Sequence, residues 1–226
     1  MEQPEESDLP SQDAIVQRLA RYLRHEMGDL LQAIYSTIAV LVERLPNDLI
    51  HEKRLLKDLK GRAELCKIEL DALVQLVSPQ RVSGAQVDLA ALVSSIVVQV
   101  RRRFPALEID LACEEEVTVF TDIQATMFSA AFLLTALGNQ AQKKMEVNVR
   151  KDGISALWEF SRDGYPVGNE QIAWISTPFT TTQQSMFGLS LSLLGRTLEP
   201  FQGTLAVNNG LPSGVRVLIT LPLLDR

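Results

Sequence analysis

Residues 16–41 read VQRLARYLRHEMGDLLQAIYSTIAVL, and the spacing of their apolar side chains indicates a long amphipathic helix. At about 100° per residue, the apolar side chains fall in one stripe along that helix: Val16, Leu19, Leu23, Met27, Leu30, Ile34, Ile38 and Leu41. His25 is rotated by about 200° from Leu23, which lies at the centre of the stripe. The pattern therefore predicts a helix over residues 12–45 that carries His25 on its solvated side.

A second amphipathic helix is predicted over residues 49–77, after a turn at Pro46-Asn47-Asp48. Its apolar positions also recur at helical spacing: Leu55, Leu59, Cys66, Leu70, Leu73 and Val77. An isolated hairpin of this length buries only one face of each helix, so we expect two copies to form a four-helix bundle across a two-fold axis. Packing of the hairpin onto the remainder of its own chain is the monomeric alternative.

The 226-residue chain has an ordinary globular composition, with 46% hydrophobic and 22% charged residues. Its net charge of -6 argues against a general nucleic-acid binder, which needs a basic surface. No run of about 18 apolar residues is present to span a membrane, and the acidic residues 1–11 lack the apolar core of a signal peptide. These features predict a cytoplasmic protein that begins with a disordered acidic tail.

After Ser83-Gly84 the helical pattern gives way to alternating strands and helices. We expect helices over 89–103, 125–144 and 189–199, a short helix over 170–174, and strands over 107–111, 117–120, 146–150, 155–161, 203–207 and 215–221. This order is typical of a sandwich in which helices cover one face of a sheet. The predicted organisation is therefore a tail (1–11), a helical hairpin (12–80) and a mixed α/β domain (84–226).

Residues 25–34, HEMGDLLQAI, resemble the H-box of sensor histidine kinases, in which the histidine accepts a phosphoryl group. The match retains the histidine, the adjacent acid and the following apolar positions: His25, Glu26, Met27, Leu31 and Ile34. Leu30 stands where the family usually has proline, and Asp29 stands where asparagine or threonine is common. That asparagine or threonine is linked in the family to kinase or phosphatase chemistry.

The second half of the chain resembles the ATP-binding domain of the same kinases, which belongs to the gyrase and Hsp90 superfamily. The landmarks occur in the family's order: the N-box helix at 132–143, the Pro-Phe loop at 177–182, the second glycine box at 188–193, and closing strands at 202–205 and 214–217. The resemblance implies an α+β fold, with a helical hairpin that forms a dimeric four-helix bundle, followed by an α/β sandwich of the histidine kinase, gyrase and Hsp90 ATPase type.

Several positions that hold nucleotide in the family carry other residues here. Thr135 replaces the first N-box asparagine, while Asn139 matches the second. Arg162 stands at the position of the adenine-binding aspartate and is followed by Asp163 and then Gly164. A guanidinium has no acceptor for the adenine amino group. Met186 and Ser190 replace glycines around Gly188, and their side chains obstruct the approach of phosphate to backbone N–H groups. The resemblance therefore implies a degenerate nucleotide site.

These features favour a histidine phosphotransferase similar to the dimeric bacterial ones, which relays phosphate between response-regulator receiver domains. His25 would carry the phosphoryl group, and the Glu26 carboxylate would accept the ring proton. The residues expected to contact the receiver are Arg21, Tyr22, Asp29 and Gln32. We expect this chain to bind no metal or cofactor of its own, with Mg²⁺ supplied by the receiver domain.

Two other functions fit the same sequence. One is a divergent but active soluble histidine kinase, which would bind ATP and phosphorylate itself. The other is a non-catalytic module that binds regulators and does not need the imidazole of His25. His51, followed by Glu52 at the start of the second helix, is interpreted as a surface residue without a role.

Overall fold

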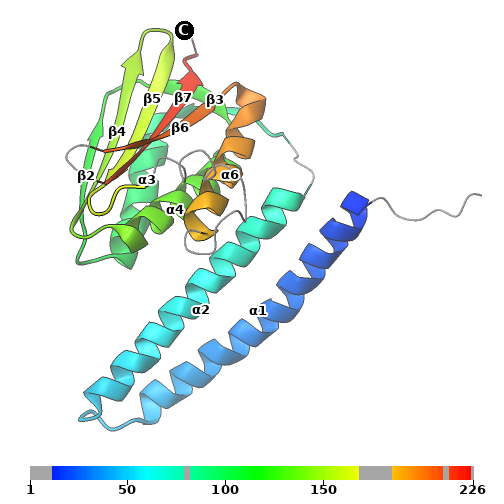
Figure 1. Ribbon diagram of the computed structural model, residues 1–226, viewed down its shortest axis with the longest axis vertical. Coiled ribbons are helices and arrows are strands. Elements are labelled where there is room, and N and C mark those ends of the chain that lie inside the picture. Colours follow the sequence, from blue (N-terminus) through cyan, green and yellow to red (C-terminus); the bar gives the residue numbers. More distant parts are fainter. Residues whose placement is uncertain (1–11, 79–81, 168–184, 211–213, 225–226) are drawn as a thin grey trace, which may run out of the picture. The chain divides into compact units, whose positions relative to one another are not determined.

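The computed structural model describes residues 12–78, 82–167, 185–210 and 214–224. The chain divides into two compact units, Met1–Pro79 and Gln80–Arg226, which Figure 1 shows in blue to cyan and in green to red. The acidic tail, the short helix expected over 170–174 and the Pro-Phe loop at 177–182 lie outside the described residues.

The first unit is a hairpin of α1 (Gln12–Arg44) and α2 (Ile50–Val77), which pack against each other along their length (Figure 1). The predicted turn separates them: α1 ends before Pro46, and Lys53 Nζ donates a 2.8 Å hydrogen bond to the side-chain oxygen of Asn47. Proline lacks the N–H that a continued helix would need, so the chain reverses there. Both helices predicted from apolar periodicity are confirmed.

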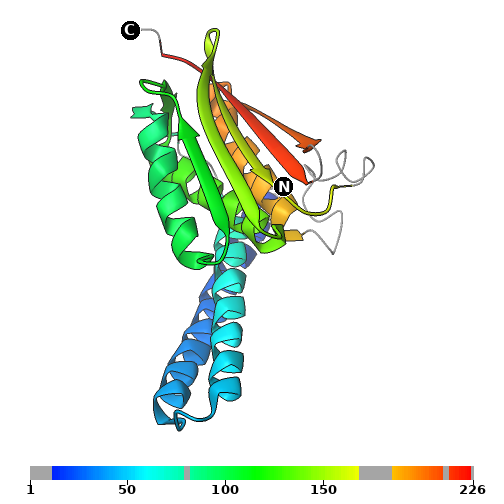
Figure 2. The ribbon, with the colours of Figure 1, turned by 90° about the vertical axis from the view of Figure 1, so that its left-hand side faces the viewer.

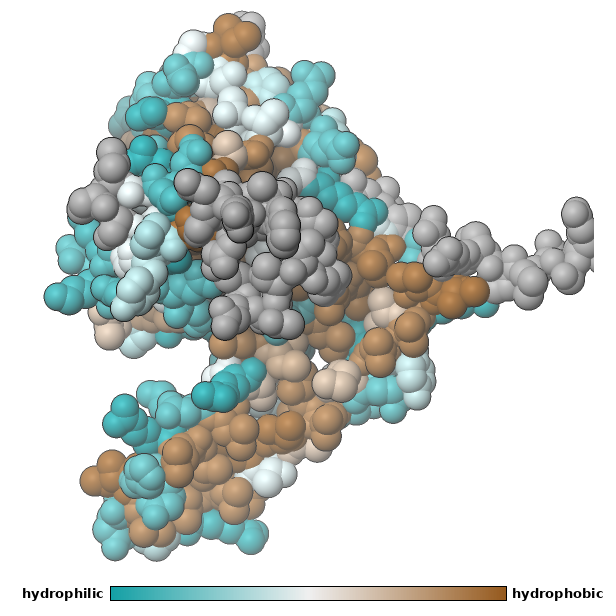
Figure 3. All heavy atoms as spheres, viewed as in Figure 1, coloured by the Kyte–Doolittle hydropathy of each residue, from teal (hydrophilic) through white to brown (hydrophobic). Residues whose placement is uncertain are grey.

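The hairpin buries one edge of the predicted α1 stripe, at Ile38, and the neighbouring Leu31, which the predicted stripe did not include. Leu31 and Ile38, seven residues apart, are each 4% exposed, and Ala63 of α2 is 6% exposed. The stripe residues Val16, Leu19, Leu23, Leu30 and Leu41 keep 43–54% of their surface exposed, and Leu55 and Leu59 of α2 are exposed as well. Figure 3 shows this apolar surface in brown along the hairpin. Within the described ranges, no helix combines the length and apolarity needed to cross a bilayer.

The second unit contains a five-stranded sheet in the order β2-β4-β5-β7-β6. Its strands are β2 (Glu108–Cys113), β4 (Lys144–Asp152), β5 (Ser155–Arg162), β6 (Thr204–Asn209) and β7 (Val215–Pro222). β2 and β4 are parallel, and the other pairs are antiparallel. A separate antiparallel pair joins β1 (Ala85–Asp88) to β3 (Thr118–Thr121).

Three helices lie on one face of the five-stranded sheet, as Figure 2 shows: α3 (Leu89–Arg103), α4 (Ile123–Gln140) and α6 (Ser185–Leu198). A short 3₁₀ turn, Glu199–Phe201, follows α6. Asp88 caps α3 by accepting the backbone N–H of Ala90, and Asp122 caps α4 by accepting that of Ala125. These caps satisfy N–H groups that have no partner within the helix. The α+β architecture expected from the sequence is confirmed.

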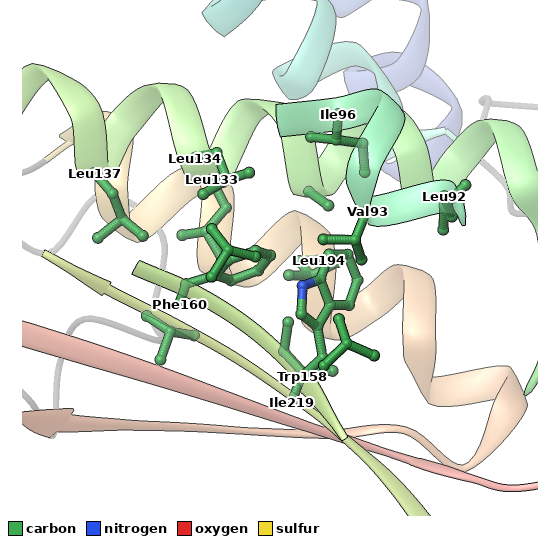
Figure 4. Packing of buried hydrophobic residues seen from close by; sticks show 14 of the residues in the cluster. Leu92, Val93, Ile96, Leu133, Leu134, Leu137, Trp158, Phe160, Leu194 and Ile219 are labelled. Carbon is green, nitrogen blue, oxygen red and sulfur yellow. The ribbon is translucent and has the colours of Figure 1, made fainter. Parts of the chain in front are cut away.

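The core lies between the sheet and these helices (Figure 4). Along β5, Trp158 and Phe160 are fully buried, whereas the alternate residues Leu157 and Glu159 lie half-buried on the other face. The rings of Trp158 and Phe160 contact edge to face, with centroids 4.7 Å apart. Leu133, Leu134 and Leu137 of α4, Val93 and Ile96 of α3, and Leu194 of α6 pack into the same core. The alternation in β5 therefore determines which side chains meet the helices.

The differences from the predicted elements include the end of one helix and the presence of one additional strand. The helix expected over 125–144 ends at Gln140, because the backbone N–H groups of Gln142 and Lys143 bond to the side chain of Asp163 and Lys144 begins β4. The four-residue strand β1 was not predicted, because only Val87 in it is buried and so short a segment shows no alternation.

Replacement of Phe160 by alanine should lower the free energy of unfolding by about 3–5 kcal/mol, because the missing ring leaves a cavity in the core. Leu157→Ala, on the open face of the same strand, should cost much less. Chemical denaturation of the full-length chain measures both. Equal losses for the two variants would contradict the register of β5 described above.

Candidate functional site

His25 lies in the middle of α1, and its side chain is 74% exposed. It is rotated by about 120° from Leu31, which packs in the seam between the two helices. The contact between α1 and α2 therefore leaves the imidazole uncovered. This agrees with the prediction that His25 lies on the solvated side of the helix. The ring is open to a reacting group on another molecule.

Two carboxylates approach the same nitrogen of the His25 ring. Nδ1 lies 3.4 Å from Oδ2 of Asp29, one helical turn later, and 3.9 Å from Oε1 of Glu26. Among the described residues none pairs with Nε2. From the sequence, Glu26 was expected to accept the ring proton and Asp29 to contact the receiver, but the Asp29 carboxylate lies nearer to Nδ1 than that of Glu26. The spacing of four residues between His25 and Asp29 was the signal that could have indicated this pair.

The other residues expected to contact a receiver domain are exposed on α1 around His25. Arg21 and Tyr22 lie one turn before it, and Gln32 lies two turns after it. Arg21 Nε donates to the backbone carbonyl of Gln17 at 3.3 Å, which holds the guanidinium along the helix. At Gly28, which was not among the predicted site residues, no described atom apart from its chain neighbours and the adjacent backbone of α1 lies within 4 Å of the place a Cβ would take. A partner therefore has room to approach the α1 backbone beside His25.

In the second unit, Arg162 is buried at the end of β5. Its two terminal nitrogens donate to the side-chain oxygen of Gln140 at 3.1 Å and to the carbonyl of Asp163 at 3.0 Å. Burial lowers the pKa of the Arg162 guanidinium, and the nearby Asp163 carboxylate acts against that shift. Nε is buried and has no partner among the described residues. The guanidinium thus joins the end of β5 to the end of α4.

The Asp163 carboxylate also accepts hydrogen bonds from its own chain. It accepts the backbone N–H of Gln142 at 2.9 Å and of Lys143 at 3.0 Å. Burial acts to raise the pKa of Asp163, but these backbone donors, with that of Lys144, outweigh burial and lower it. Gly164 follows with φ of +101°, a backbone conformation that other residues rarely adopt. Asp163 therefore holds the connection from α4 to β4, and its carboxylate oxygens already accept hydrogen bonds.

The remaining nucleotide-site positions lie on α4 and at the start of α6, which pack against each other. The hydroxyl of Thr135 donates to Ala131 O at 2.7 Å, and that of the fully buried Ser190 donates to Phe187 O at 2.7 Å. The side-chain amide of Asn139 donates to the sulfur of Met186 at 3.4 Å. Gly188 is buried between Met186 and Ser190. The structure thus brings these positions together, with their polar groups bonded to the protein itself.

This set of groups does not fit ATP and its Mg²⁺. Adenine recognition needs an acceptor, but the aligned position holds a buried cation, and the adjacent carboxylate already accepts backbone N–H groups. Of the groups expected to hold metal and phosphate, Thr135 bonds within its own helix and Asn139 bonds to a thioether. Among the described residues, these polar groups connect α4 to α6 and to the end of β5.

Comparisons with solved structures identify the architecture. The full-length kinase ShkA in complex with AMPPNP aligns with a TM-score of 0.67 over 93% of this chain and 47% of that one, at 18% identity. The mycobacterial sensor histidine kinase MprB aligns at 0.56 and 18% identity, over 64% of this chain and 100% of that one. The catalytic domain of the histidine kinase ThkA aligns at 0.55 and 18% identity, over 62% and 96%.

The chain has the histidine-kinase fold. No family model matches the sequence, and no curated protein does. Because the alignment with ShkA covers 93% of the chain, it includes residues of both units, whereas the other two alignments cover 64% and 62%. At these identities the similarity is one of fold.

Replacement of Asp163 by asparagine should lower the free energy of unfolding at neutral pH by about 1 kcal/mol, because the backbone N–H groups lose a charged acceptor. The pKa of Asp163 is depressed in the folded chain, so its stabilisation is present above the ordinary carboxylate pKa of about 3.9 and is lost as pH falls through the folded value. The difference between wild type and variant should therefore shrink in acid. Denaturation at several pH values measures it, with the exposed Glu115→Gln as control. A difference independent of pH would contradict this role.

Proposed function

We propose that this chain is a histidine phosphotransferase of a bacterial two-component phosphorelay. His25 would take a phosphoryl group from the aspartyl phosphate of one receiver domain and pass it to the aspartate of another, without phosphorylating itself from ATP. One observation supports the proposal: in a chain with the histidine-kinase fold, the histidine that resembles the H-box histidine is exposed, while the residues at the nucleotide-site positions form hydrogen bonds within the protein.

The chemistry at His25 is a direct displacement at phosphorus. The lone pair of one ring nitrogen forms the P–N bond as the P–O bond of the acyl phosphate breaks, and the receiver carboxylate leaves with the electron pair. Such a transfer depends mainly on alignment and on neutralisation of charge, for which the receiver domain supplies its own Mg²⁺. The exposure of His25 supports it, because the phosphate belongs to another molecule.

The surface around His25 suits a partner with an acidic active site. Arg21 offers a cation, Tyr22 an amphipathic ring, and Gln32 an amide that both donates and accepts. Gly28 leaves the α1 backbone open beside the imidazole. We therefore propose that a receiver domain docks on this side of α1.

The exposed apolar stripe supports a homodimer. Leu19, Leu23 and Leu30 each keep more than 40% of their surface exposed in the single chain, on the side of α1 away from His25. Burial of this stripe against a second hairpin removes apolar area from water and leaves the imidazoles accessible. The second unit would then act as a structural flank and a docking surface.

A transfer assay tests the proposal. Purified receiver domains are phosphorylated with labelled acetyl phosphate and mixed with wild type, His25→Gln and, as the matched control, His51→Gln. Label should pass to wild type and to His51→Gln but not to His25→Gln, because only His25 carries the phosphoryl group.

A parallel mixture with labelled ATP should label none of the three proteins. Labelling of wild type from ATP would contradict the proposal and favour an active kinase. Transfer to His25→Gln, or regulator binding without any transfer to wild type, would contradict it in favour of a binding module.

Sedimentation equilibrium tests the dimer. Leu23→Glu should weaken self-association by at least about tenfold, because it places a charge inside the proposed interface. Ala39→Glu adds the same charge on the opposite side of α1 and should leave the association constant unchanged. Wild-type protein that sediments as a monomer would contradict the four-helix bundle.

A further inference from the structure

The nearest carboxylate to the His25 ring belongs to Asp29, one of the two residues at which the chain departs from the H-box pattern. We propose that Asp29, rather than Glu26, is the positioning residue that keeps the ring proton on Nδ1 and so presents Nε2 to phosphorus. This inference rests on the proposed phosphotransferase function and assigns the proton-holding role within that same site.

Helix geometry explains why Asp29 is better placed than Glu26. Side chains four residues apart lie above one another on a helix, whereas adjacent side chains diverge by about 100°. The distances agree: 3.4 Å from Nδ1 to Asp29 and 3.9 Å to Glu26. Both carboxylates lie on the Nδ1 side, and a proton is held most favourably on the nitrogen nearest the negative charge. The lone pair then remains on Nε2.

His51 provides a comparison within the same chain. It is followed by Glu52, as His25 is followed by Glu26, but it has Leu55 at the position that corresponds to Asp29. No carboxylate among the described residues forms an ion pair with His51, whereas His25 has two such neighbours. Each histidine is therefore followed directly by a glutamate, but only His25 has a carboxylate residue one helical turn later.

A proton held on Nδ1 serves both directions of a relay. When Nε2 attacks, the P–O bond of the acyl phosphate breaks, the receiver carboxylate departs with the electron pair, and the ring becomes a phosphoimidazolium that retains the Nδ1 proton. The Asp29 carboxylate opposes that positive charge. In the return step the P–N bond breaks and neutral imidazole leaves with the electron pair, which is easier than the departure of an anionic ring. Asp29 therefore supports acceptance as well as donation.

Nitrogen NMR tests the proton position without reference to activity. Long-range ¹⁵N–¹H spectra of the neutral rings are recorded for wild type, Glu26→Gln, Asp29→Asn and Asp29→Glu, with His51 as the internal reference in each sample. The Nδ1–H form of His25 should dominate in wild type and Glu26→Gln, be lost in Asp29→Asn, and return in Asp29→Glu. His51 should give the same spectrum in all four proteins.

Transfer kinetics provide the second measurement. Asp29→Asn should slow both acceptance from and donation to a receiver by about tenfold, less than the loss of a buried general base. Glu26→Gln should cause a smaller loss, and Asp29→Glu should restore most of the rate. An unchanged His25 tautomer in Asp29→Asn, or a larger loss in Glu26→Gln, would overturn this inference while leaving His25 as the phosphoryl carrier. Label on His25→Gln would instead overturn the proposed function, whatever the tautomer.

Discussion

The register of β5 is the constraint on which the second unit depends. β5 lies between β4 and β7, with Phe160 opposite Val147 on one side and Val217 on the other. A slip by one residue would turn Trp158 and Phe160 out of the core, so the pairing is fixed along the whole strand. With a period of two, the same register turns Arg162 inward at the end of β5. A cation is thereby held at the margin of an apolar core and needs acceptors.

Those acceptors come from α4 and from the residue after β5. Gln140 and the carbonyl of Asp163 accept from two of the guanidinium nitrogens, while the Asp163 carboxylate accepts the backbone N–H groups of Gln142 and Lys143. Breaking such an arrangement leaves a buried charge without a partner, so its members are tied to one another. The histidine-kinase fold is thus accompanied here by polar groups that join the end of β5 to α4 and to the start of β4.

The hairpin differs from the second unit in that the three sides of α1 have different surroundings. Leu31 and Ile38 face α2, the stripe around Leu23 and Leu30 remains exposed, and His25 lies on a polar side with Asp29. The proposed group transfer needs an accessible nucleophile, and the proposed dimer needs apolar area. A helix supplies both without conflict, because positions only a few residues apart point in different directions.

The sequence by itself determined the two long helices, most strands of the sheet, the solvated side of His25 and the identity of Arg162 at the end of β5. Each of these depends on a period or a residue type within one segment. Only the tertiary structure decided that α1 meets α2 through Leu31 and not through the centre of its stripe, and that α4 stops at Gln140. The stop depends on Asp163, which lies 21 residues beyond Gln142 and reaches it only after β4 and β5 have paired. Periodicity depends on residues that are neighbours in the sequence, whereas hydrogen bonds between distant segments form only after packing has brought those segments together.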